Sequence, residues 1–148
     1  MNKVIVFFIL IGIFVATFYF TSEINPIFTM ENVVDACVVS DRAISVENIK
    51  NGQKYYNYCK YDEVKDLLQH NQCDALQLSF DKRNEKEIKK QCKFQEISRQ
   101  KLGDIEILYG YTPFWHDCKY VDGKKVNMQI AIYDAKVIAG FPLLLTGY

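Results

Sequence analysis

The sequence Asp122-Gly-Lys-Lys-Val-Asn-Met-Gln-Ile-Ala-Ile-Tyr133 decides the fold of this chain. From Val126 onward apolar and polar side chains alternate, which places Asn127 and Gln129 on the face opposite the aliphatic residues. An Asp-Gly dipeptide is typical of the tight turn of a β-hairpin. The pattern therefore predicts a strand over residues 124–133 that pairs with residues 115–121.

Extended segments on both sides of this stretch lengthen the sheet. Residues 94–100 and 105–111 are joined at Gly103-Asp104, and residues 137–145 follow a turn to form the last strand. Consecutive strands joined by tight turns pair antiparallel. The sequence thus predicts an antiparallel meander that ends at the carboxyl terminus.

The preceding part of the chain mixes strands and helices. Asn51-Gly52 joins the extended residues 43–49 and 54–58 in a hairpin, and residues 73–80 alternate as a half-buried strand. Helical spacing predicts helices over residues 29–39 and 61–71, and a third after Asn84 with Ile88 and Cys92 facing inward. The run over 29–39 is also short and β-branched enough to be a strand. Two or three helices packed on one face of the sheet make the predicted class α+β.

Residues 4–20 carry no charge and suggest a membrane anchor. As a helix, residues 4–22 would be roughly 28 Å long, close to the ~30 Å hydrocarbon core of a bilayer. Lys3 before the span predicts a cytoplasmic N-terminus, with a cleaved signal peptide as the alternative. The predicted organisation is a transmembrane anchor (1–22), a stalk (23–27) and one extracytoplasmic α+β domain (28–148).

Composition narrows the partners and the chemistry. The 18 Lys and Arg residues balance 18 Asp and Glu residues and are interspersed with them. Such a surface argues against nucleic acid as a ligand, because phosphate binding needs uncompensated positive charge. The five cysteines include no C-x-x-C pair, so they predict buried thiols or one structural disulfide, and no cofactor is expected.

Several residues are candidates for binding or chemistry. Asn127 and Gln129 predict a polar binding surface, unless they satisfy buried backbone groups or form the wet face of the sheet. The aromatic residues Tyr55, Tyr56 and Trp115 would add contact area for a ligand. No catalytic residue is predicted, but His116 and Cys118 would point the same way from a strand, about 7 Å apart, as a metal or Cys/His pair requires.

The last third of the chain carries a resemblance. Residues 109–113 (Tyr-Gly-Tyr-Thr-Pro), 122–131 and 139–148 resemble the C-terminal part of the YwmB-like proteins of spore-forming bacteria. The resemblance implies an α+β fold and a membrane-associated or exported protein. It implies no catalytic residues, and the family's label as TATA-box-binding-like records a fold comparison and no DNA function. This chain is shorter than those proteins and has five cysteines.

These observations together predict a non-enzymatic, single-pass, outward-facing interaction domain in envelope or sporulation-related assembly. Its partners would be the membrane, through residues 4–20, and another envelope protein. The alternative is a membrane-tethered metal, redox or hydrolytic enzyme that uses His116 and Cys118.

Overall fold

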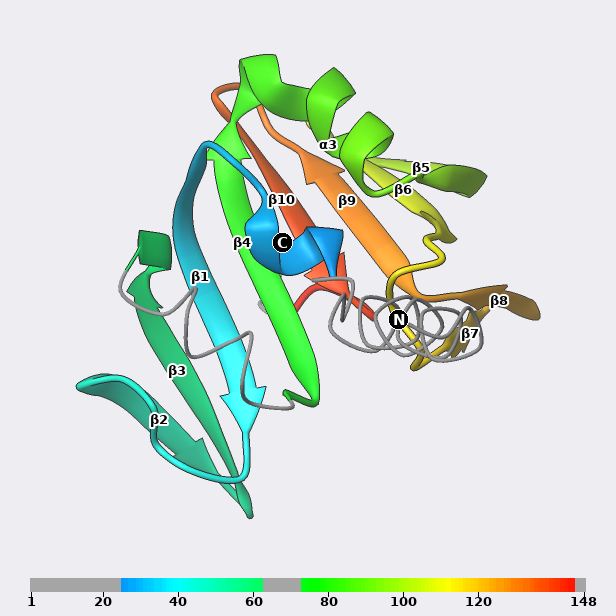
Figure 1. Ribbon diagram of the computed structural model, residues 1–148. Helices are drawn as coiled ribbons and strands as arrows, with labels where there is room; N and C mark the ends of the chain where they lie inside the picture. The colour runs from blue at the N-terminus through cyan, green and yellow to red at the C-terminus, as the bar shows by residue number, and fades with distance from the viewer. Residues whose placement is uncertain (1–24, 63–72, 146–148) are drawn as a thin grey trace, which may run out of the picture.

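An eight-stranded antiparallel sheet dominates the computed structural model, which describes residues 25–62 and 73–145 (Figure 1). In sheet order the strands are β2 (Glu47–Asn51), β3 (Lys54–Lys60), β1 (Val33–Ser40), β4 (Ala75–Asp81), β10 (Lys136–Phe141), β9 (Met128–Ile132), β6 (Ile105–Tyr111) and β5 (Gln95–Leu102). The remaining elements are the 3-10 helices η1 (Pro26–Thr29) and η2 (Lys82–Asn84), the α-helix α3 (Glu85–Gln91), and a separate ribbon of β7 (Lys119–Val121) and β8 (Lys124–Val126).

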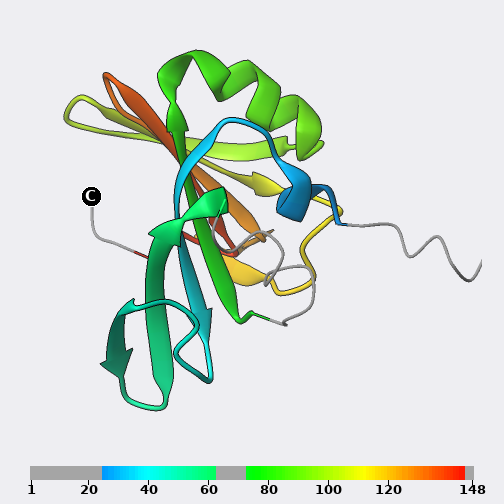
Figure 2. The same ribbon diagram turned by 60° about the vertical axis from the view of Figure 1, so that its left-hand side comes forward.

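The hydrophobic core lies on one face of the sheet. Alternation along β4 turns Leu76, Leu78 and Phe80 to this face, and all three are at most 1% exposed. Ile27 of η1 and Ile88 of α3 join the same cluster, so both short helices lie over this side of the sheet (Figure 2). Each fully buried side chain of this size stabilises the fold by about 1.5–3 kcal/mol.

The antiparallel hairpins follow the turn residues in the sequence. Gly52, Gly103 and Gly123 all have positive φ and join β2 to β3, β5 to β6 and β7 to β8. The predicted meander is present in part, because β5, β6, β9 and β10 are successive neighbours in the sheet. The predicted strand over residues 124–133 is divided at Asn127 into β8 and β9, and β8 pairs with β7 outside this sheet. The last strand is shorter than predicted, since β10 ends at Phe141 and residues 142–145 turn back over the sheet.

The predicted α+β class with a transmembrane helix and two or three packed helices is wrong. Residues 29–39, predicted as a helix, form the end of η1 and most of β1, where four valines favour the pleated sheet and two strands flank them. Within the described residues, α3 is the one α-helix with both ends defined. The helix predicted over residues 61–71 lies mostly outside the described residues.

The predicted single-pass membrane protein is also contradicted. Across residues 25–62 and 73–145, no helix has both the length and the apolar character needed to cross a membrane. The seven-residue α3 would reach only about 10 Å, a third of the bilayer's apolar thickness. Residues 4–22, on which the anchor and the cytoplasmic N-terminus were predicted, lie outside the described residues.

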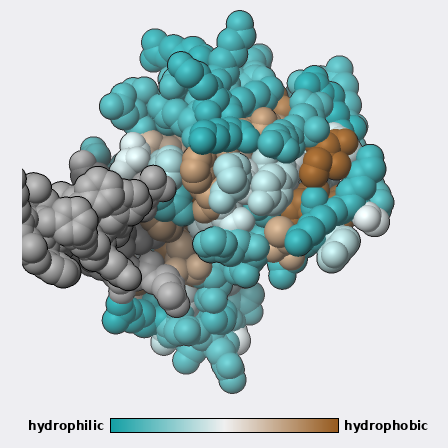
Figure 3. Space-filling view, turned by 45° about the vertical axis from the view of Figure 1, so that its right-hand side comes forward, coloured by the Kyte–Doolittle hydropathy of each residue, from teal (hydrophilic) through white to brown (hydrophobic). Residues whose placement is uncertain are grey.

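Polar residues form most of the outer surface. Seen from the side of β5 and β6, hydrophilic residues dominate and hydrophobic ones are restricted to smaller patches (Figure 3). The edge strand β5 contributes Arg99, which pairs with Glu96 at 2.9 Å and Glu106 at 2.6 Å. Charges on an edge strand discourage pairing with another chain.

A substitution at Gly110 tests how closely Phe94 and Gln95 pack against β6. A Cβ at this position would meet the Phe94 ring and lie 2.5 Å from the Gln95 carbonyl oxygen. We expect Gly110→Ala to lower the free energy of unfolding by about 1–3 kcal/mol, the usual cost of overpacking. Urea unfolding followed by the fluorescence of Trp115, the only tryptophan, measures the loss. Gly103→Asn is the control, because its Cβ meets open space and asparagine tolerates positive φ.

Candidate functional site

The segment that follows β6, residues 112–118, belongs to neither sheet and is held by the side chain of Asn127. The Asn127 Oδ1 accepts the backbone N–H of Thr112 at 2.7 Å. Its Nδ2 donates to the carbonyl oxygens of Thr112 at 2.8 Å and Trp115 at 2.6 Å. Asn127 is fully buried, so these bonds replace the strand pairing that the segment lacks. The sequence left three possible roles for Asn127, and its side chain fits the one in which it satisfies buried backbone groups.

Further hydrogen bonds connect this segment to two other parts of the chain. Thr112 donates from its hydroxyl to the carbonyl oxygen of Cys92, directly after α3, at 2.5 Å. Asn25, the residue before η1, donates from Nδ2 to the carbonyl oxygen of Phe114 at 2.7 Å. The start of η1, the end of α3 and residues 112–116 are thereby held in one arrangement.

Between these three segments lies a groove of about 620 Å³, which we call the His116 groove. Its lining residues are Asn25, Pro26, Gln91, Lys93, Pro113, Phe114 and His116. Trp115 points the other way, into the core, where its ring centroid lies 5.6 Å from that of Phe141. The inward tryptophan anchors the segment and leaves Phe114 and His116 to line the groove. The volume falls within the usual range of about 300–1,000 Å³ for ligand sites.

Lys93 has an unusual backbone conformation at this groove. Its φ is +47°, and the N–H groups of Lys93 and Phe94 bond to the carbonyl oxygens of Lys90 and Lys89. This is the Schellman ending of a helix, whose left-handed position normally holds glycine. A lysine there costs about 1–2 kcal/mol, so the side chain sits at this place despite a conformational penalty.

Lys93 gives the lining of the His116 groove a positive charge. The Nζ of Lys93 lies 5.4 Å from the centre of the Phe114 ring, and the exposed imidazole of His116 is on the same hollow. Neither side chain makes a hydrogen bond or ion pair with another described residue, and no carboxylate is among the lining residues. Two nitrogen donors beside an aromatic ring suit a ligand that carries carboxylates and some apolar surface.

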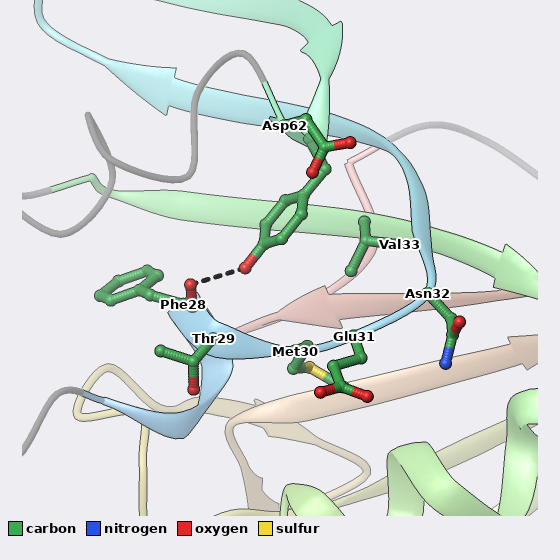
Figure 4. Close-up of a pocket in the computed structure, with 8 residues that line it drawn as sticks. Phe28, Thr29, Met30, Glu31, Asn32, Val33 and Asp62 are labelled. Atoms are coloured by element: carbon green, nitrogen blue, oxygen red, sulfur yellow. Dashed lines mark hydrogen bonds between the residues drawn. The ribbon is translucent and has the colours of Figure 1, made fainter.

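A second cavity, of about 580 Å³, lies on the other side of η1 (Figure 4). Burial raises the pKa of Tyr61 to about 12, so its phenol is protonated and donates to the Phe28 carbonyl oxygen at 2.6 Å. Figure 4 shows Phe28 and Met30 along one wall and Asp62 across from them. The Tyr61 hydroxyl is therefore already used to connect the end of β3 to η1, and the polar group in this cavity has a structural role.

A third hollow, of about 570 Å³, lies between the start of η2 and the turn after β9. It is lined by charges of both signs, including Lys82 and Asp134, whose charged atoms are 3.9 Å apart. Opposite charges that already face each other leave little net field for a ligand. The His116 groove is therefore the better candidate.

The other residues predicted to bind are spread over the sheet. Tyr55 and Tyr56 lie on β3, separated from β9 by β1, β4 and β10, and they point to opposite faces. Gln129 is 2% exposed, and its Oε1 accepts the N–H of Leu144 at 3.0 Å. Asn127, Trp115, His116 and Cys118 do lie near one another, and of these His116 lines the His116 groove.

The predicted pair of His116 and Cys118 has a different geometry from the one expected. The Cys118 thiol donates to the carbonyl oxygen of His116 at 3.6 Å, and both residues precede β7, outside any strand. All five cysteines are free thiols. Within residues 25–62 and 73–145, no three Cys, His, Asp or Glu side chains are grouped as metal ligands. A metal or catalytic role for this pair stays a prediction.

Lys93 and Phe114 are groove residues that the sequence reading missed. Helical spacing predicts a helix that ends near Cys92, and this signal could have identified Lys93 as the residue after the helix cap. Nothing in the local pattern indicates that Phe114 meets Lys93, because that contact depends on the hydrogen bond between Thr112 and Cys92.

Asn127→Asp tests the role of the buried amide. A carboxylate keeps the acceptor for Thr112 N–H but faces the carbonyl oxygens of Thr112 and Trp115 without a donor. We expect the free energy of unfolding at pH 7 to fall by about 2–4 kcal/mol, as for a buried group that loses its partners. Asn51→Asp, at an exposed turn, removes the same amide and should change stability by less than about 0.5 kcal/mol. Equal effects of the two substitutions in urea unfolding would contradict the proposed role of Asn127.

Thiol labelling tests the environment of the cysteines. Burial raises the pKa of Cys37 and Cys73 to about 11 and that of Cys92 to about 12. Their reactive thiolates are therefore scarce in the folded protein at pH 8 and become more abundant only as the pH approaches those values. We expect iodoacetamide to modify the partly exposed Cys118 first and Cys92 only after urea unfolding, as followed by peptide mass spectrometry. Fast labelling of Cys92 in the folded protein would contradict this.

Comparisons with known proteins give no relative for this chain. No protein-family model matches it, no curated protein is similar to it, and no solved structure matches its fold. The resemblance to the YwmB-like proteins therefore stays a prediction, and the function must be argued from the His116 groove itself.

Proposed function

We propose that this chain is a non-enzymatic interaction domain whose His116 groove receives an acidic segment of a partner protein. The observation that carries the proposal is the convergence of Lys93 and His116 on one hollow with no carboxylate in its lining. Both residues offer N–H donors, and Phe114, two residues before His116, offers an apolar surface beside Lys93. A peptide with carboxylates around an apolar or aromatic residue matches these groups.

The rigidity of the groove supports a binding role. Its walls are joined by the hydrogen bonds from Asn127, Thr112 and Asn25, so little ordering is needed when a ligand enters. Binding to a preformed site avoids part of the entropy cost of association. A charge-assisted hydrogen bond to the Lys93 ammonium would contribute about 1.5–3 kcal/mol.

The conformation of Lys93 supports the same proposal. Glycine would fit the left-handed backbone of Lys93 better than lysine does. The contact between the Lys93 ammonium and the Phe114 ring stabilises the protein by only about 0.5–1 kcal/mol at an exposed site, which is less than the conformational cost. Backbone strain of this kind gathers at functional sites, and here it places a cation over the groove.

The test compares two peptides on the full chain. One is an acidic pentapeptide with a central phenylalanine, and the other has Asn and Gln in place of Asp and Glu. We expect only the acidic peptide to shift the amide NMR signals of Lys93, Phe114 and His116, with affinity that falls as salt is added. Equal binding of the two peptides, or shifts elsewhere on the molecule, would contradict the proposal.

Lys93→Gly separates binding from stability. Loss of the ammonium should weaken the acidic peptide about 10-fold or more, while relief of the left-handed lysine keeps the free energy of unfolding at or above that of the original chain. Lys90→Gln is the matched control, because it removes an exposed lysine of the same helix end that does not line the groove. His116→Gln should weaken the peptide without a change in fold. A groove that only stabilises the protein would show the opposite result, with lower stability and unchanged binding for Lys93→Gly.

A further inference from the structure

Residues 143–145 lie across the face of the sheet that is opposite the core. Beneath them a row of three residues runs across neighbouring strands, with Gly140 of β10 paired to Gln77 of β4 on one side and to Gln129 of β9 on the other. Gln129 accepts the N–H of Leu144 at 3.0 Å, and Gln77 accepts the N–H of Leu145 at 2.9 Å. We call this row the glutamine cradle.

The glutamine cradle is built for a polypeptide backbone. A Cβ on Gly140 would lie 2.5 Å from the Leu144 nitrogen and 2.6 Å from the Leu143 carbonyl group, so only glycine allows the backbone to come this close. The acceptor on Gln129 is held by a side chain that is 2% exposed. Two successive N–H groups are recognised, and both hydrogen bonds are independent of the side chains of the bound segment.

The bound segment is held weakly compared with the strands. Leu143, Leu144 and Leu145 are each only partly buried, whereas Phe141 is fully buried and fixes the end of β10. Segments with little buried apolar surface open at lower free energy than the core. Pro142 is buried as well, so the chain can open after Pro142 without disturbing the sheet.

We propose that the glutamine cradle is an exchangeable site for an extended peptide segment, filled within one chain by residues 143–145. The occupant to which it is fitted is this same segment, from the chain itself or from a second copy. Because the chain's own segment is tethered, it competes at an effective concentration in the millimolar range. Binding from outside is consequently masked until the tethered segment is weakened, as in any site that is mostly occupied.

The experiment weakens the tethered segment and leaves the cradle intact. Leu144→Pro removes the N–H that Gln129 accepts, and Leu144→Ala is the matched control that keeps it. The probe is an acetylated Pro-Leu-Leu-Leu peptide, the sequence of residues 142–145, with two lysines added for solubility. A second probe is methylated on the nitrogens equivalent to Leu144 and Leu145, so it has the same side chains without the two donors.

We expect the Leu144→Pro chain to bind the first peptide at least 10-fold more tightly than the methylated one, by isothermal titration calorimetry. The original chain and Leu144→Ala should bind both peptides at least 10-fold more weakly than this. Equal binding of the two peptides by Leu144→Pro, or no binding, would overturn the proposal.

Hydrogen exchange on the original chain gives an independent answer if Leu144→Pro does not fold. The Leu144 and Leu145 amides should exchange at least 10-fold faster than the paired amides of β9 and β10. Exchange of all these amides at one common rate, set by global unfolding, would show that the segment does not open and would overturn the proposal.

Discussion

The fold depends on buried and half-buried side-chain amides that satisfy the backbone of segments outside the sheet. Asn127 serves residues 112–115 in this way, Gln129 and Gln77 serve Leu144 and Leu145, and Asn57 accepts the N–H groups of Ile44 at 2.7 Å and Ser45 at 3.3 Å. A buried backbone group without a partner costs about 1–3 kcal/mol. Each amide supplies the partners that strand pairing cannot, so irregular segments can pack directly against the sheet.

This arrangement explains how one chain carries two different proposed recognition surfaces. On the core face, Asn127 fixes the backbone of Trp115, whose ring enters the core, and the neighbouring Phe114 and His116 then line a groove with Lys93. On the opposite face the cradle offers acceptors for a backbone and no charge. The groove is selective for charged side chains, whereas the cradle is selective for an extended main chain.

Local patterns in the sequence were enough to predict much of the sheet. The two-residue period of residues 75–81, the turns at Gly52, Gly103 and Gly123, and the inward Ile88 and Cys92 are all present. Residues 29–39 were wrongly predicted as a helix because their valines match both the helical and the strand period, and pairing of β1 with β3 and β4 decides between them. The site depended still more on distant contacts. Hydrogen bonds between residues far apart in the sequence, such as Thr112–Cys92 and Asn127–Trp115, bring Lys93 near His116, and no local spacing encodes them.

The two surfaces are physically connected through β9 and the end of β10. Asn127 and Gln129 are two residues apart, so a change in the register of β9 would displace the groove and the cradle together. Phe141, which contacts Trp115, is also the last residue before the segment that fills the cradle. Phe141 is completely buried, so the end of β10 is held in the core beside Trp115, next to the segment that fills the cradle. A smaller side chain at this position would lose the ring contact with Trp115 and weaken this link between the groove and the cradle.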